Sequence, residues 1–304
     1  MAQLISNLPI GAVVKFGKHS VGTEIAEPII WIVVDKNHTG YPNNSVTLMT
    51  RQIIDLLAYD GAESNYATFG RSPYALSNIN QWLNSSASAG TWYTAKDSLD
   101  APPSDANVKD NKGYQTKAGF LYNFAASERD ILLSTTLKVQ VTGETFGNTN
   151  AQVFLPSAVE VGQMGVEDDS VLLSYFDSNE RGATLTTQAF NNTSASTKPS
   201  SITTKWEYWT RNWRPSNSNV YTIKGNSRPE SDPYDGTIGV RPMVNISSSA
   251  LVSDSTDADG CYTLSITNAP TAPTNVQIVT SPVYTTKPCS IKWSGSNDPN
   301  GDVV

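Results

Sequence analysis

Residues 1–266 alternate between short apolar runs and stretches rich in glycine, proline, asparagine and serine. Residues 28–34 are almost continuously apolar, which predicts a strand that is buried on both faces. Residues 45–50 follow after a Tyr-Pro-Asn-Asn turn, so we expect these two segments to pair as a hairpin. Further strands are predicted at residues 12–17, 136–141, 152–156, 219–223 and 261–266.

Two short segments carry helical periodicity instead. In residues 77–83 the apolar side chains, among them Trp82, fall on one helical face, and Ser77 is placed to cap the N-terminus. A second helical region is expected within residues 119–133, with Ser127 as its N-cap. Few helices among many strands predict an α+β, β-rich fold.

Polar, low-complexity segments separate these elements. Residues 84–117 are rich in Ser, Ala, Asp and Asn, and we interpret them as a long surface excursion. Residues 143–150 are expected to form a turn, and residues 191–204, rich in Ser and Thr, a mobile loop. We expect the two long loops to display ligand-binding side chains, with Trp92 and Tyr93 as candidates in the first.

The composition changes near residue 269, where a Pro-rich segment begins. We therefore expect one domain over residues 1–268, and a linker with an incomplete second module over residues 269–304. Residues 275–279 and 289–293 alternate as two strands. The Pro-rich entry and these strands resemble the opening of a fibronectin type III module, a β-sandwich of ~100 residues.

Trp206, Trp209 and Trp213 fall close together in the chain. An aromatic ring combines a large apolar face with a polar edge, so two uses are open. The cluster can build the domain core, as we expect for Trp31 and Trp82, or it can form an exposed surface on which sugars stack.

Arg211 lies within this tryptophan cluster, and Arg241 lies in a Gly-Val-Arg-Pro motif about thirty residues later. Both arginines stand between apolar residues. A guanidinium group carries five N–H donors in a rigid fork and needs acceptors in such surroundings. We therefore expect both to be structural residues that bind carboxylates or backbone carbonyls.

Charge and composition narrow the class of partner. The chain has 21 Lys and Arg against 28 Asp and Glu, a net charge of -7, and its basic residues are scattered. Nucleic-acid binding requires clustered basic residues, so we expect none. No segment approaches transmembrane length, and residues 1–10 lack the basic and apolar regions of a signal peptide. We therefore expect neither membrane insertion nor signal-directed export.

No arrangement of residues indicates catalysis or a zinc site. His19 and His38 stand in turn-like contexts without cysteine or histidine neighbours, and we expect both in surface loops. Cys261 and Cys289 are interpreted as buried free thiols, with a disulfide as the alternative.

We expect no cofactor and no metal, with calcium as an alternative at one loop. Asp254, Asp257 and Asp259 could supply oxygen ligands, although the EF-hand pattern is absent. The acidic run at residues 167–169 is interpreted as a solvated turn.

Several short motifs follow one another across residues 1–266: Gly11-x-x-Val14-x-Phe16-Gly17, Pro28-Ile-Ile-Trp31-x-Val33, Gln81-Trp-Leu-Asn84, Ser127-Glu-Arg129, Val153-Phe-Leu-Pro156-Ser157, Trp209-Thr-Arg211 and Gly239-Val-Arg-Pro242. Their order resembles a bacterial and phage domain of unknown function. Members carry Trp-Trp-x-Arg-Ser where this chain has Tyr-Trp-Thr-Arg-Asn, a departure at two places. That family looks distantly similar to the C-type lectin-like fold of formylglycine-generating enzymes and phage tropism determinants. The resemblance implies core strands at the tryptophan and Val-Arg-Pro segments, with long loops at one end.

Three functions are open at this stage. The first is a non-enzymatic virion protein of a phage or phage-like particle, in its tail, baseplate, fibre or capsid decoration. Such a protein would assemble with copies of itself and other virion proteins, and would adhere to a host-surface glycan. The second is a secreted bacterial adhesin, which the expected lack of a signal peptide disfavours. The third is an enzyme on a formylglycine-generating-like scaffold, which needs reactive cysteines where only Cys261 is present.

Overall fold

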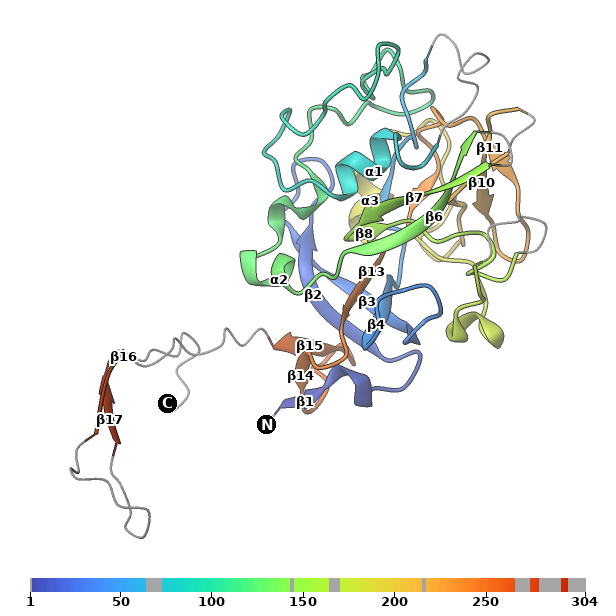
Figure 1. The fold of residues 1–304 in the computed structure, drawn as a ribbon. Helices are drawn as coiled ribbons and strands as arrows, with labels where there is room; N and C mark the ends of the chain where they lie inside the picture. The colour runs from blue at the N-terminus through green and yellow to red at the C-terminus, as the bar shows by residue number, and fades with distance from the viewer. Residues whose placement is uncertain are drawn as a thin grey trace. The chain divides into compact units, whose positions relative to one another are not determined.

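The computed structural model describes residues 2–63, 73–142, 145–163, 170–214, 217–265, 274–278 and 291–294 (Figure 1). The chain divides into two units, Met1–Leu264 and Ser265–Val304. Strands far outnumber helices in the described residues, so the fold is β-rich with few helices.

The apolar runs of the sequence form the middle of a mixed sheet in the first unit, with strand order β1-β14-β15-β2-β3-β4-β13-β8. β3 is predicted to be buried on both faces, and from Trp31 to Asp35 its residues are all buried. The predicted hairpin of β3 and β4 is confirmed, with Trp31 opposite Thr50. The strands of this sheet are β1 (Ala2–Leu4), β14 (Leu251–Ser253), β15 (Tyr262–Ser265), β2 (Val13–His19), β3 (Glu27–Lys36), β4 (Ser45–Thr50), β13 (Met243–Ser247) and β8 (Val153–Phe154).

A second sheet has the order β11-β10-β9-β12-β5. Every residue of β9 is buried, which explains why this segment contains two tryptophans. Gly239 of β12 pairs with Tyr208, and a Cβ at Gly239 would lie 2.8 Å from the carbonyl oxygen of Glu207. Only glycine permits this approach. The strands of this sheet are β11 (Glu230–Ser231), β10 (Val220–Ile223), β9 (Tyr208–Trp213), β12 (Gly239–Val240) and β5 (Asp55–Leu56).

Short helices lie between the strands. The hydroxyl of Ser77 accepts a hydrogen bond from the backbone N–H of Asn80, as predicted for an N-cap. The prediction of Ser127 as a cap is wrong, because that helix begins at Ala126 and its N-cap residue is Ala125, whose N–H donates to the carboxylate of Glu128. The helices are η1 (Ile5–Asn7), α1 (Asn78–Leu83), η2 (Phe120–Asn123), α2 (Ala126–Asp130), η3 (Ser174–Asp177) and α3 (Thr187–Asn192).

The prediction of a turn over residues 143–150 is also wrong. β6 (Thr135–Thr142) pairs with β7 (Thr145–Ala151) in an antiparallel hairpin, in which Leu137 faces Thr149. The sequence of β7 is polar and contains glycine and two asparagines, so its composition favours a loop. The apolar β6 supplies a partner, and pairing across the hairpin decides the conformation.

The second unit contains two described strands, β16 (Thr274–Ile278) and β17 (Ile291–Ser294), which pair antiparallel. The predicted linker at residues 269–273, and Cys289, lie outside the described residues. Cys261 is a buried free thiol. No helix in the described part of the chain has the length and apolar character needed to cross a membrane.

Candidate functional site

The excursion at residues 84–119 contains no helix or strand, yet it is anchored on the core by its aromatic residues. Trp92 stacks on Tyr114 with ring centroids 5.5 Å apart and an interplanar angle of 11°. The hydroxyl of Tyr114 donates to the carbonyl of Ala58 at 3.0 Å. Trp92 is only 4% exposed, so it anchors the loop and is not the displayed ligand-binding side chain that the sequence predicts.

The second long loop, at residues 193–206, contacts the first. The hydroxyl of Ser194 donates to the side-chain oxygen of Asn111 at 2.9 Å. The backbone N–H of Ser196 donates to the carbonyl of Asp110 at 2.7 Å. The Asn111 amide donates in turn to Leu56 in the second sheet. Two loops that are distant in the sequence therefore form one surface.

Two of the three tryptophans of the 206–214 segment belong to the core. Trp209 and Trp213 are fully buried, and the indole N–H of Trp209 donates to the carbonyl of Leu57 at 2.8 Å. Trp206 is half-buried, with its N–H bound to Thr237. The alternative of a sugar-stacking surface does not fit Trp209 and Trp213, because no face of either ring reaches solvent. Trp31 and Trp82 are likewise buried.

Arg211 forms a buried ion pair with Glu160. Both terminal nitrogens of the guanidinium group lie 2.6 Å from a carboxylate oxygen, in bidentate geometry. Tyr41 donates to the same carboxylate at 2.5 Å. Burial by itself raises the pKa of Glu160, but Arg211 and the hydrogen bonds outweigh burial and lower it.

Arg241 is buried among oxygen acceptors. Its Nε donates to the carbonyl of Thr50 at 3.0 Å, and Nη1 donates to the carbonyl of Arg181 at 3.1 Å and to the hydroxyl of Tyr208 at 3.3 Å. Arg241 is 2% exposed, so its charge is fixed inside the protein. These contacts give it a structural role.

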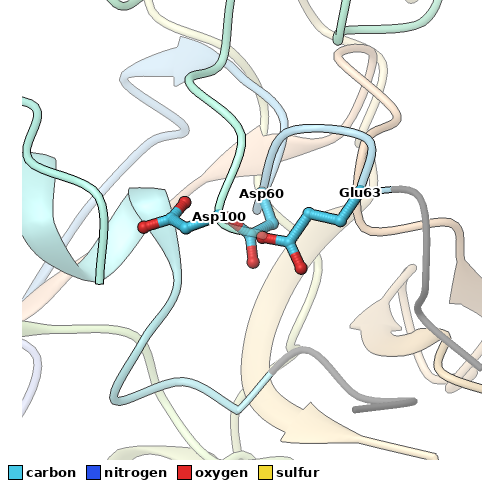
Figure 2. A group of neighbouring side chains, drawn as sticks. All are labelled: Asp60, Glu63 and Asp100. Carbon is cyan, nitrogen blue, oxygen red and sulfur yellow. The ribbon is translucent and has the colours of Figure 1, made fainter. Parts of the chain in front are cut away.

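Asp60, Glu63 and Asp100 form a cluster of carboxylates beside the first loop (Figure 2). One oxygen from each lies within 4.8 Å of the others. Asp60 follows β5, and Asp100 lies in the excursion. Asn78, the first residue of α1, joins them, because its N–H donates to Asp60 at 3.0 Å and its amide to Asp100 at 3.2 Å.

The electrostatics of this carboxylate cluster are unfavourable to three negative charges. Burial and the neighbouring Glu63 raise the pKa of Asp60 well above its ordinary value. Burial, then Asp100 and Asp97, raise the pKa of Glu63 to about 7. Burial also raises the pKa of Asp100. Carboxylates this close can share protons, and they are also the hard oxygen ligands that Ca²⁺ and Mg²⁺ take.

Tyr93, the second predicted ligand-binding residue of the loop, lies next to this cluster. Its hydroxyl donates to the backbone carbonyl of Asp100 at 3.1 Å. Burial and Asp100 raise the pKa of this hydroxyl. Tyr93 is half-buried, and Trp92 meets its ring edge-on. Tyr93 therefore keeps part of its ring at the surface, whereas Trp92 does not.

The aspartate loop predicted as a calcium alternative binds a lysine. The ammonium group of Lys15 lies 2.6 Å from Asp257 and 2.5 Å from Asp259. These contacts lower the pKa of Asp257. The acidic run at residues 167–169 lies outside the described residues.

The prediction that both histidines lie in surface loops is wrong. His19 ends β2 with 11% of its side chain exposed, and its Nε2 lies 3.5 Å from the carboxylate of Asp55. His38 has 2% exposed, and its Nδ1 lies 2.6 Å from Asp35. The turn-like residues next to each histidine in the sequence do not reveal the carboxylates that the fold brings close to the two imidazole rings.

Asp55 is the centre of a small charged group. The ammonium group of Lys117 lies 2.8 Å from Oδ2 of Asp55. The backbone N–H of Leu56 donates to the other carboxylate oxygen, Oδ1. Burial by itself raises the pKa of Asp55, but Lys117 and His19 outweigh burial, so the pKa is lowered. His19 and Lys117 also line a cavity of ≈ 410 Å³, and His19 lines a second one of ≈ 150 Å³.

One family matches the chain: a domain of unknown function (DUF6273), over residues 43–248. The chain belongs to this family. The resemblance to a domain of unknown function is thus confirmed at that level. No curated protein and no solved structure matches the chain.

The DUF6273 match runs from β4 to β13 and includes both long loops. It contains the carboxylate cluster and the Arg211–Glu160 pair, whereas Lys15 and His19 precede it. Sequence reasoning missed the carboxylate cluster, because Asp60 and Asp100 are far apart and no spacing rule connects them. The only local signal is that Asp60 follows an apolar strand, where a charged residue needs an explanation.

Proposed function

We propose that this DUF6273 protein is a non-enzymatic structural component of a phage or phage-like particle, and that it displays its long loops to a host-surface glycan. The observation that carries the proposal is the joining of residues 84–119 and 193–206 into one surface on a β-rich scaffold. A rigid scaffold that positions long loops is a common arrangement for binding.

Two features of the sequence support the particle setting. The chain is rich in Ser, Thr and Asn and poor in charge, which suits work outside the cell. Its motifs resemble a phage-associated domain with a C-type lectin-like fold, and its last residues resemble the start of a fibronectin type III module. The resemblance implies long loops at one end of the domain, and we propose that residues 84–119 and 193–206 are these loops.

Weak adhesion at each copy is sufficient in a particle. Linked sites convert later contacts into intramolecular ones, so avidity exceeds the affinity of one site by ~10²–10⁴-fold. We therefore propose that the protein assembles with copies of itself and with other virion proteins, and that it works in the virion.

Mass spectrometry of purified particles tests the assignment to a virion. The protein should be present in stoichiometric amounts with the major particle proteins. Absence from particles, combined with presence on the bacterial surface, would favour the secreted adhesin instead.

Adsorption of variant particles tests the display role. Ser201 and Thr203 are exposed in the second loop. Replacing both with glutamate should reduce adsorption to host cells, because two charges must then be desolvated at the contact. The matched control is Ser255→Glu, an exposed position outside both loops. If intact particles with the loop variant adsorb as well as particles with the control variant, the loop does not contact the host and the protein has an architectural role.

A further inference from the structure

The cavity of ≈ 410 Å³ beside His19 and Lys117 has the size and lining of a small-ligand site. Ligand pockets in proteins measure roughly 300–1,000 Å³ and combine apolar walls with a few polar groups. Here the walls come from the end of β2, from α1 and from the segment that leads into η2. We propose that this cleft binds one sugar unit of a glycan, a proposal that rests on the adhesive role above and gives it a binding site.

One lining residue of the cleft, Lys117, is held in place by a buried carboxylate. Asp55 is 1% exposed and holds Lys117 at 2.8 Å. An ammonium group has three N–H donors, and Lys117 directs one of them to Asp55. The ammonium group donates to no other side chain or carbonyl that the structure describes, so two of its N–H groups remain for a ligand. His19, a second lining residue, packs against Trp82 in T-shaped geometry at a centroid distance of 5.8 Å.

Three polar side chains, called the rim here, supply both hydrogen-bond donors and hydrogen-bond acceptors to the cleft. Ser20, Thr116 and Asn123 line the cleft, and their side chains make no hydrogen bond to any residue that the structure describes. Hydroxyl and amide groups both donate and accept. A ligand that satisfies such a rim must also donate and accept along its edge, as the hydroxyls of a sugar do.

Tyr122 gives the cleft an apolar face. It is 50% exposed, and it is the one aromatic side chain among the exposed large apolar residues of the described chain. A tyrosine ring offers a flat apolar surface with a polar tip. The C–H face of a sugar ring can pack on that surface while its hydroxyls reach the rim.

The charge of the lining selects between ligand classes. Lys117 is the one lysine or arginine among the residues that line the cleft, and no carboxylate lines it. A cationic ligand or a metal ion therefore finds no counter-charge there. A neutral sugar satisfies the rim, and an acidic sugar would in addition place its carboxylate near Lys117.

Ligand-observed NMR of the full chain tests the site, because it detects millimolar affinity. The probes are the methyl glycosides of glucose, galactose, N-acetylglucosamine and glucuronic acid. At least one should show saturation transfer. Tyr122→Ala should weaken its binding at least tenfold, whereas Tyr122→Phe, which keeps the ring, should weaken it less than threefold. Val171→Ala, which shortens another exposed apolar side chain, is the matched control and should bind normally.

A second variant identifies the kind of sugar. Asn123→Asp introduces a carboxylate at the rim, so it should weaken the glucuronide more than the neutral glycosides if Lys117 contacts the acid group. Lys117 itself is unsuitable for substitution, because its loss leaves Asp55 uncompensated inside the protein.

Absence of saturation transfer from all four glycosides, or binding that Tyr122→Ala leaves unchanged, would overturn the proposal. Either result leaves the particle assignment intact, since mass spectrometry decides that separately. Conversely, a protein that is missing from particles but binds a glycoside in this cleft would retain the site and lose the virion role.

Discussion

Glu160 and Asp60 are both buried carboxylates of the first unit, but their surroundings shift their pKa values in opposite directions. Glu160 receives a bidentate arginine, so its pKa is lowered despite burial. Asp60 has two further carboxylates as neighbours, so its pKa is raised well above its ordinary value. Burial acts the same way at both sites, and the charge of the neighbours decides the outcome.

The opposite pKa shifts distinguish a carboxylate whose charge is compensated by an arginine from carboxylates whose charges are not compensated. At the Arg211–Glu160 pair, Tyr41 and the N–H of Ser157 also bind the carboxylate, and little capacity is left. At the carboxylate cluster the negative charges repel one another, and Asp100 lies in the long loop between α1 and η2. Burial and like-charge neighbours shift pKa values in this way at many functional sites.

The largest effect is expected from breaking the compensated pair. Arg211→Met removes the charge, retains much of the volume and leaves Glu160 buried alone, which should cost about 3–5 kcal/mol of unfolding free energy. Urea denaturation measures the loss. The double variant Arg211→Met/Glu160→Gln should recover most of it, because no uncompensated charge remains. An unchanged midpoint for the single variant would show that the pair is not buried as described.

Arg241 should come next. Arg241→Met leaves the carbonyls of Thr50 and Arg181 and the hydroxyl of Tyr208 without their donor, at a cost of about 2–4 kcal/mol. Thermal unfolding measures it. Arg241→Lys should recover only part of the loss, because a point charge cannot reach all three acceptors. Normal stability with lost glycoside binding would make Arg241 a ligand residue.

The carboxylate cluster should give a smaller effect with a distinct pH dependence. The pKa of Glu63 is raised from 4.5 to about 7, so between these values the folded state binds more protons than the unfolded state. Stability therefore falls as pH rises through this window. Glu160 has a lowered pKa, so its charge stabilises the folded state above the ordinary pKa of a glutamate. That stabilisation is lost as the pH falls below this value.

Chemical denaturation at pH 5 and pH 8 measures this difference. Glu63→Gln should flatten the profile and stabilise the protein at pH 8 by about 1 kcal/mol, a value reduced for the partial exposure of Glu63. Addition of EDTA should leave both profiles unchanged if the charges alone are responsible. A profile that Glu63→Gln does not alter would contradict the raised pKa.

The smallest effect is expected at an exposed pair of the first loop. Lys112 lies 3.3 Å from Asp105, and 72% of the Lys112 side chain is exposed. Water and salt screen such a pair, so Lys112→Ala should not shift the unfolding midpoint measurably. A clear loss of stability would mean that the excursion depends on its surface charges as well as its buried aromatic rings.

Local pattern was sufficient for the elements whose own residues decide their state. The apolar run of β3 and the spacing of Trp82 with its neighbours predicted a buried strand and an amphipathic helix, and both are present. The polar β7 was misassigned, because its strand conformation depends on pairing with β6. The two possible uses of Trp209 and Trp213 were likewise separated only by the burial of β9.

The sequence by itself determined the β-rich class, the positions of the main strands and the need of Arg211 and Arg241 for oxygen acceptors. These follow from hydrophobic periodicity and from the need of a guanidinium group for acceptors, which are properties of neighbouring residues. Only the tertiary structure brought Asp60 to Asp100, His19 to Asp55 and Ser194 to Asn111. Each of these contacts joins segments that are far apart in the chain, and the packing of strands and loops between them decides which side chains meet.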